Sequence, residues 1–125
     1  MAKVLIVDDE EAILMMYSES LKAGGHSVIT AGNGEEGIES AKKNKPDLIF
    51  LDIIMPRVNG LDVLKELKAD PDVKNIPVFL LTNLPEDASG GKAKELGVTG
   101  YLVKAQVEPA KLEEIVEEAV KNRGK

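Results

Sequence analysis

Six polar residues that could do chemistry stand at the ends of apolar runs. They are Asp8, Asp9 and Glu10 after KVLIV (3–7), Asp52 after DLIFL (47–51), Thr82 after PVFLL (77–81) and Lys104 after GYLV (100–103). Asp52 is the most informative of them, because its run continues on the other side as LIFLDIIMP. A carboxylate inside such a run is costly unless a partner or a ligand stabilises it.

The set has the composition of a phosphoryl-transfer site. Two carboxylates about 4 Å apart repel by roughly 4 kcal/mol at an effective dielectric of 20. Mg²⁺ relieves such repulsion, because it is held by one or two carboxylates and keeps water and phosphoryl oxygens as further ligands. Lys104 supplies a point charge that can hold phosphate, and Thr82 supplies a hydroxyl donor. Asp52 is the simplest nucleophile and would form an aspartyl phosphate.

The elements that must position these residues alternate along the chain. The apolar runs at 3–7, 26–30, 47–51, 77–81 and 100–103 predict five strands, and the segments at 10–25, 34–46, 60–71, 85–97 and 109–125 predict five helices. Continuous rather than alternating apolar runs are typical of parallel strands covered on both faces. We therefore expect an α/β fold, an open, doubly wound, five-stranded parallel sheet of order 2-1-3-4-5, flavodoxin-like. In that order the first and third strands are neighbours, so Asp8, Asp9 and Asp52 meet in one crevice.

Two helices carry further predictions. The helix at 10–25 is expected to bury Ile13, Met16, Tyr17 and Leu21. The helix at 85–97 contains Gly90 and Gly91, each about 1 kcal/mol less favourable than Ala in a helix interior. It is either a short helix preceded by a loop or an element that a signal can rearrange.

Composition narrows the class of protein. The 125 residues predict one domain spanning 1–125, with no effector domain after the last helix. A net charge of −6 argues against direct nucleic-acid binding, and no apolar stretch predicts a membrane span. The chain has no cysteine, and its single histidine, His26, cannot build a metal site alone. We expect a soluble, cytoplasmic protein and a structural role for His26.

Several spaced motifs resemble those of the response-regulator receiver domains (the CheY-like family of two-component signalling). The family pattern is an acidic pair after the first strand, Asp after the third, Thr or Ser after the fourth and Lys after the fifth. Here these motifs read VDDEE, LDIIMPRVNG, LLTN and YLVK, and the second also contains Met55, Pro56 and Gly60. The resemblance covers essentially the whole chain.

The resemblance implies a function and a role for each residue. Asp52 would accept phosphate from a sensor histidine kinase or a histidine phosphotransferase. Asp9 and Asp52 would bind Mg²⁺ together with the backbone carbonyl of Ile54, and Asp8 would act partly through water. Thr82 and Tyr101 would be the switch pair. Their movement would alter the face of the fourth helix, fifth strand and fifth helix, through which a downstream protein is contacted.

The chain departs from the family pattern at two positions. Ala105 stands where the family usually has a proline in a cis peptide, and since a non-proline cis bond costs about 2.5–4 kcal/mol we expect a trans bond there. Asn83 stands where the family favours a smaller residue, which would narrow the phosphate's approach. Two aliphatic residues, Ile54 and Leu84, lie two positions beyond Asp52 and Thr82, and we expect them to shield an acyl phosphate from water.

Two other functions are open to test. GNGEEG (32–37) fits the G-x-G-x-x-G pattern of dinucleotide-binding proteins. It follows the second strand, at the edge of the expected sheet, and a turn and helix start explain it without a ligand. The other alternative is a pseudo-receiver, an interaction module that keeps the fold without phosphorylation. All the key site positions are filled, which argues against it.

Overall fold

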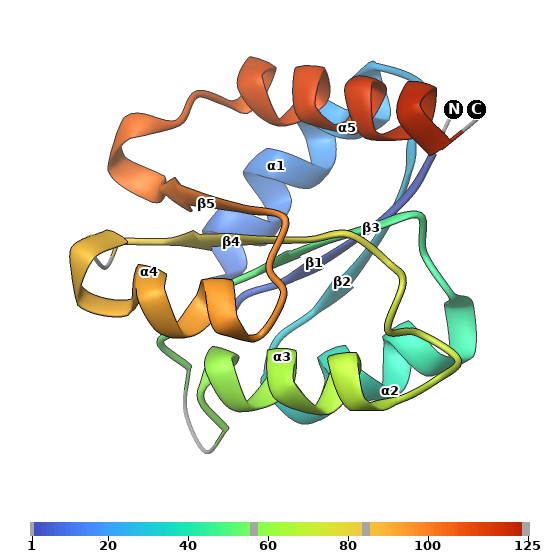
Figure 1. The fold of residues 1–125 in the computed structure, drawn as a ribbon. Coiled ribbons are helices and arrows are strands. Elements are labelled where there is room, and N and C mark those ends of the chain that lie inside the picture. The colour runs from blue at the N-terminus through green and yellow to red at the C-terminus, as the bar shows by residue number, and fades with distance from the viewer. Residues whose placement is uncertain (1, 56–57, 84–85, 124–125) are drawn as a thin grey trace.

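The sheet has the predicted architecture in the computed structural model, which describes residues 2–55, 58–83 and 86–123, with only the backbone for 86–90 and 122–123. The five strands are β1 (Lys3–Val7), β2 (Ser27–Ala31), β3 (Leu48–Leu51), β4 (Val78–Thr82) and β5 (Gly100–Val103). All pair in parallel in the order β2-β1-β3-β4-β5 (Figure 1). The predicted fold class and strand order are therefore confirmed.

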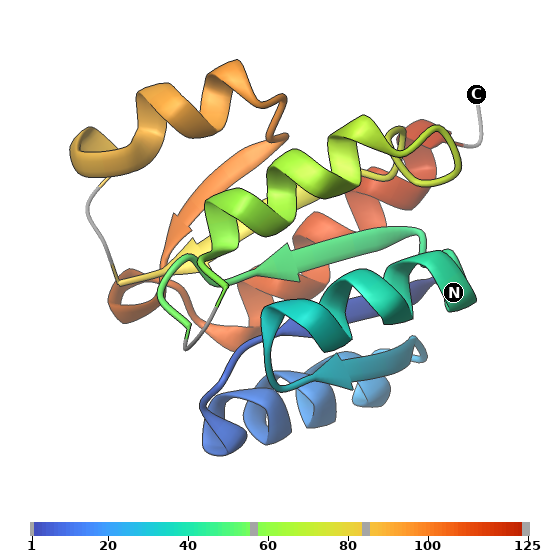
Figure 2. The ribbon, with the colours of Figure 1, turned by 90° about the horizontal axis from the view of Figure 1, so that it is seen from below.

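Five helices cover the two faces of the sheet. They are α1 (Glu11–Ala23), α2 (Gly34–Asn44), α3 (Gly60–Ala69), α4 (Glu86–Glu95) and α5 (Pro109–Arg123). Figures 1 and 2 show α1 and α5 on one face and α2, α3 and α4 on the other. A short 3₁₀ turn, η1 (Lys104–Gln106), follows β5. Within the described residues, no helix combines the length and apolar character that a membrane crossing needs.

The core has two halves, one on each face of the sheet. One half joins α2, α3 and α4 to residues such as Leu5, Ile49 and Leu80, and the other joins α1 and α5 to Val4, Phe50 and others. Strands β1 and β3 contribute to both halves, because successive side chains point to opposite faces. These two central strands lead directly into the site, and all of their residues except Lys3 are buried.

Some expected details differ from the structure. Met16 is 42% exposed, so its placement on the inner face of α1 was wrong; Tyr17, Ser18 and Leu21 are the buried residues there. At 3.6 residues per turn, position 16 lies roughly 150° around the helix from the centre of a face that contains positions 14, 17, 18 and 21, so it points away from the core. Residues 26, 47 and 77 lie outside the strands, while Thr82 is the last residue of β4. The backbone N–H of Lys3 donates a hydrogen bond to the Asp47 side chain, which explains the polar residue just before β3.

The glycine-rich segment after β2 is a helix start. The Asn33 side chain accepts a hydrogen bond from Glu36 N–H at 2.9 Å, and the Glu36 carboxylate accepts one from Gly32 N–H at 2.8 Å. These reciprocal bonds form a cap at the beginning of α2. A Cβ on Gly37 would lie 2.9 Å from Val7, so this glycine permits close packing of α2 on β1. Both features explain the motif without a nucleotide.

Gly60 allows the loop after Asp52 to fold back on α3. Its N–H donates to the Ile53 carbonyl at 2.7 Å, and an added Cβ would overlap the Asp52 carbonyl oxygen and lie 2.6 Å from Ile53 Cα. Because the neighbouring atoms are backbone, they cannot rotate away. The position requires glycine to keep the backbone of Asp52 in place.

We predict that Gly60→Ala lowers the free energy of unfolding by about 1–3 kcal/mol through this overlap. Gly91→Ala is the matched control, because a Cβ there meets nothing within 4 Å. The control should be neutral or up to about 1 kcal/mol stabilising, since alanine favours the helix. Urea unfolding of the two variants measures both effects, and equal changes in the two would contradict this account.

Candidate functional site

Backbone hydrogen bonds extend the sheet by one residue and so fix the two buried aspartates. Asp8 N–H donates to the Ala31 carbonyl and Asp52 N–H donates to the Val7 carbonyl, both at 3.0 Å. Asp8 is 1% exposed and Asp52 is 4% exposed. The predicted meeting of these side chains at the carboxyl edge of β1 and β3 is therefore observed.

Lys104 lies between the carboxylates. Its Nζ atom is 2.5 Å from Asp8 Oδ2, 2.8 Å from Asp52 Oδ2 and 3.2 Å from Glu10 Oε1. The lysine side chain is 5% exposed, whereas that of Glu10 is 57% exposed. The two buried pairs are shielded from solvent, so they are the strong members of the cluster, and the Glu10 pair is weakened by water.

A pocket of about 250 Å³ opens over this cluster. Its lining residues are Asp9, Glu10, Asp52, Ile54, Thr82, Asn83 and Lys104. Thr82 is fully buried, while Asp9 is exposed at the rim. Five of the predicted site residues thus line one pocket, with Asp8 beneath it: Asp9, Asp52, Ile54, Thr82 and Lys104.

Burial and charge act against each other in the site. Burial raises the pKa of the Asp8 carboxyl above its ordinary value, although hydrogen bonds from Lys104 and from Glu10 N–H partly oppose this. Burial alone would lower the pKa of Lys104, but hydrogen bonds to Asp52 and Asp8 outweigh it and raise that pKa. Lys104 therefore stays charged, while the surroundings of Asp8 disfavour its charged form.

The oxygen atoms present suit a hard divalent cation. Carboxylate oxygens of Asp8, Glu10 and Asp52 lie within 4.8 Å of one another. One ammonium does not neutralise three carboxylates, and Mg²⁺ prefers such oxygen ligands. Glu10 was not among the predicted ligands; the signal for it was its place as the third acid in VDDEE. Asp9 lines the pocket but is not in this trio, and its role as a ligand, like that of the Ile54 carbonyl, remains a prediction.

The remaining predicted residues are placed as follows. Tyr101 lies opposite Leu80 in the β4–β5 pairing and is half-buried against the core on the α2–α4 side. No cis peptide occurs among the residues that the structure describes, so the expected trans bond before Ala105 is confirmed. Met55 is buried in the core. Leu84 and Pro56 lie outside the described residues.

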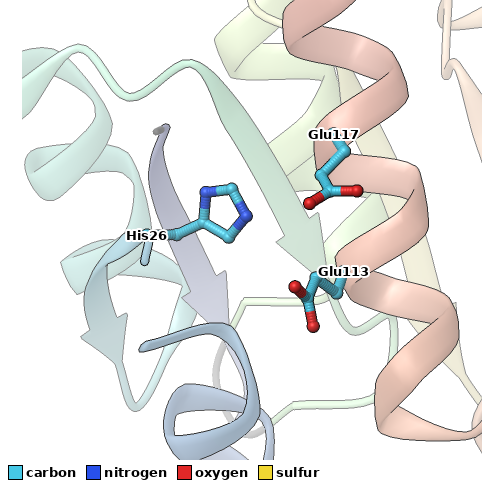
Figure 3. Close-up of side chains that lie close together, drawn as sticks. All are labelled: His26, Glu113 and Glu117. Carbon is cyan, nitrogen blue, oxygen red and sulfur yellow. The ribbon is translucent and has the colours of Figure 1, made fainter. Parts of the chain in front are cut away.

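A second group of side chains, His26, Glu113 and Glu117, also gathers potential metal ligands (Figure 3). The Ala2 N–H donates to Nδ1 of His26 at 3.1 Å, so the neutral ring carries its proton on Nε2. Nε2 is buried and has no hydrogen-bond partner within the described part of the chain. Metal binding at Nε2 would need the opposite tautomer, with the proton on Nδ1. The group therefore does not fit a metal, in keeping with the structural role expected for His26.

Relatives share the chain's sequence over most of its length. PilH of Pseudomonas aeruginosa is 35% identical over 104 residues, covering 83% of this chain and 86% of PilH. The polar-differentiation response regulator DivK of Brucella anthropi is 33% identical over 112 residues, covering 90% of this chain and 91% of DivK. The alkaline phosphatase synthesis transcriptional regulatory protein PhoP of Bacillus subtilis is 38% identical over 102 residues, and the match spans 82% of this chain but only 42% of PhoP.

Solved structures and a family model agree with these relatives. The chemotaxis protein CheY4 of Vibrio cholerae superposes with a TM-score of 0.87 at 34% identity, covering 95% of this chain and 98% of that one. The model of the response regulator receiver domain matches residues 4–117. With the buried aspartates and lysine at the carboxyl edge of a 2-1-3-4-5 sheet, these matches show that the chain belongs to the response regulator receiver domain family.

Proposed function

We propose that the chain is a phosphorylation-activated signalling switch that accepts a phosphoryl group on Asp52. The observation that carries the proposal is the buried Lys104 ammonium, bonded to both Asp8 and Asp52 at the floor of an open pocket. In the reaction, an Asp52 carboxylate oxygen forms a bond to phosphorus while the bond from phosphorus to the donor breaks. The donor is a histidine phosphoramide or a small acyl phosphate, and its imidazole or its carboxylate leaves with that electron pair.

Each residue of the pocket has a part in this transfer. Lys104 provides a fixed positive charge for a phosphoryl oxygen, and the Thr82 hydroxyl provides a donor for another. Asp9, Asp52 and the Ile54 carbonyl would hold Mg²⁺, with Asp8 acting through water. The ion supplies neutralisation of phosphoryl charge when bound. The protein itself contributes positioning and preorganised charge rather than acid or base chemistry.

The signalling part of the proposal concerns the β5 side of the molecule. We propose that Thr82 and Tyr101 form the switch pair, and that phosphorylation alters the face made by α4, β5 and α5. The position of Tyr101 supports this proposal, because it is half-buried on β5 and lies opposite Leu80, two residues before Thr82 on the neighbouring strand. The upstream partner is proposed to be a histidine kinase or a histidine phosphotransferase, in the cytoplasm, and the downstream partner a protein that recognises this face.

The pocket weakens the fold that carries it. Burial raises the pKa of the Asp8 carboxyl, so the charged form of this side chain is less favourable in the folded protein than in water. If packing alone determined the residue at position 8, a neutral side chain would be expected there. The retention of a destabilising charge supports a functional role, because stability is commonly exchanged for activity at such sites.

Ile54 is proposed to control the lifetime of the phosphate. Its side chain is 59% exposed and lines the pocket, and its N–H donates to Asp52 Oδ1 at 3.3 Å. An apolar group at this rim offers no hydrogen bond to an attacking water. The aspartyl phosphate is therefore expected to hydrolyse slowly.

Phosphorylation tests the proposed function. Acetyl phosphate with Mg²⁺ should add one phosphoryl group to the wild-type protein, as measured by mass spectrometry, and none to Asp52→Asn. Asp72→Asn, an exposed aspartate in the α3–β4 turn, is the matched control and should react like the wild type. Removal of Mg²⁺ with a chelator should abolish the reaction. An unmodified wild-type protein would instead favour the pseudo-receiver, whose interactions do not need phosphate.

The lifetime proposal makes a separate prediction. Ile54→Asn should shorten the phosphate's half-life about two- to tenfold. The amide can hydrogen-bond and orient an attacking water, which is part of what a general base does. Phosphate loss is followed after the donor is removed. Ile54→Val keeps an apolar rim and should behave like the wild type, and equal half-lives for all three proteins would refute the shielding role.

The charge of Asp8 predicts a pH-dependent gain in stability. Its folded pKa is raised above the ordinary value of 3.8, so its favourable contribution is complete below that value and is lost as pH rises through the folded pKa. Asp8→Asn does not titrate and should be about 1 kcal/mol more stable than the wild type at neutral pH, a usual size for one substitution. Urea unfolding across the acid range should show this gain shrinking toward low pH, whereas a gain that grew on acidification would contradict the assignment.

A further inference from the structure

The position of Lys104 depends on a very short element. Lys104 begins the three-residue turn η1, between the end of β5 at Val103 and the start of α5 at Pro109. The backbone bond that closes this turn, from Val107 N–H to the Lys104 carbonyl, is long at 3.4 Å. Ala105 and Gln106 are both exposed. Lys104 is the only buried residue of the turn, so the turn's own hydrogen bonding and the packing of its other two residues do not fix the lysine backbone strongly.

Two consecutive residues at the end of β4 hold the neighbours of Lys104 on either side. Thr82 pairs with Val103 in the last register position of the β4–β5 ladder. Beyond it, the Asn83 side-chain Oδ1 accepts a hydrogen bond from Ala105 N–H at 3.0 Å. Lys104 lies between these two attachments, so its Cα is restrained from both sides.

The bond joins the two positions at which the chain departs from the family pattern. A proline in place of Ala105 would have no N–H and could not form this bond. The alanine has an N–H, and the amide oxygen of Asn83 is its acceptor. The two departures are thus complementary in chemistry and meet in space.

We propose that Asn83 is a positioning residue that fixes the backbone of Lys104 and so keeps its ammonium over Asp52. This inference rests on the proposed function, since it assigns Asn83 to the same phosphoryl-transfer site. Asn83 acts through Ala105 and Lys104 rather than on the phosphoryl group. The bond is exposed to water, so its effect is that of a single modest hydrogen bond.

A positioning role and a steric role for Asn83 predict opposite changes in the phosphorylation rate when Asn83 is replaced. Asn83 lines the pocket, and if it mainly narrowed the phosphate's approach, Asn83→Ala would speed the reaction. If it positions Lys104, the same change slows the reaction, because the charge is no longer held where the phosphoryl oxygens need it. The direction of the change separates the two roles.

The kinetic test compares Asn83→Ala with the wild type, with acetyl phosphate as the donor at a series of concentrations. We expect the maximal rate to fall about two- to tenfold, the range that corresponds to one net hydrogen bond. Asn33→Ala is the matched control, because its side chain also accepts one backbone N–H, at 2.9 Å, but at the start of α2. The control should lose a similar amount of stability and keep the wild-type rate. An unchanged or faster rate in Asn83→Ala would overturn the inference.

A second measurement is independent of phosphorylation. In Asn83→Ala, amide hydrogen exchange at Ala105 should accelerate and NMR relaxation should show a more mobile Lys104 ε-methylene, whereas Asn83→Asp keeps an acceptor oxygen and should protect Ala105. If the wild type takes up no phosphoryl group, the proposed function fails and these signals alone decide the role of Asn83. An Ala105 amide and a Lys104 side chain that are unchanged by Asn83→Ala would overturn the inference.

Discussion

The contact of the Lys104 ammonium with the Asp8 and Asp52 carboxylates is the constraint on which the site depends. All three groups are buried, and a buried charge without a partner is among the most unfavourable features a fold can contain. Removing Lys104 would leave two buried carboxylates without a compensating charge, which is more damaging than never having built the group. The strands that bring these residues together are therefore needed for the chemistry of the site as well as for the core.

The sheet supplies what this contact needs. The parallel order β2-β1-β3-β4-β5 places the carboxyl ends of β1, β3, β4 and β5 along one edge, and helices cover both faces (Figure 2). Fully buried residues on β1 and β3 anchor the backbone just before Asp8 and Asp52. Gly60 lets the loop after Asp52 pack tightly on the start of α3. A rigid frame of this kind holds polar groups within the small tolerances that group transfer requires.

The sequence was sufficient for the features that follow from periodicity and topology. Continuous apolar runs predicted the parallel strands, and the order of those strands then placed Asp8, Asp52, Thr82 and Lys104 together. The sequence was less informative where a residue's place depends on the direction in which its side chain points. Met16 points away from the buried face of α1 and is exposed, while Glu10 reaches back to Lys104 from the start of α1. The hydrogen bond from Ala105 to Asn83 joins residues that are 22 positions apart, and no local sequence pattern predicts it.

The proposed function requires the pocket to bind a phosphoryl group on Asp52 with the help of Mg²⁺ and Lys104. Fluorine NMR of the protein with Mg²⁺ and beryllofluoride, a mimic of the phosphoryl group, tests this most directly. Bound fluorine resonances are expected for the wild-type protein, and they should be absent without Mg²⁺ and absent in Asp52→Asn. A folded wild-type protein that shows only free beryllofluoride would contradict it.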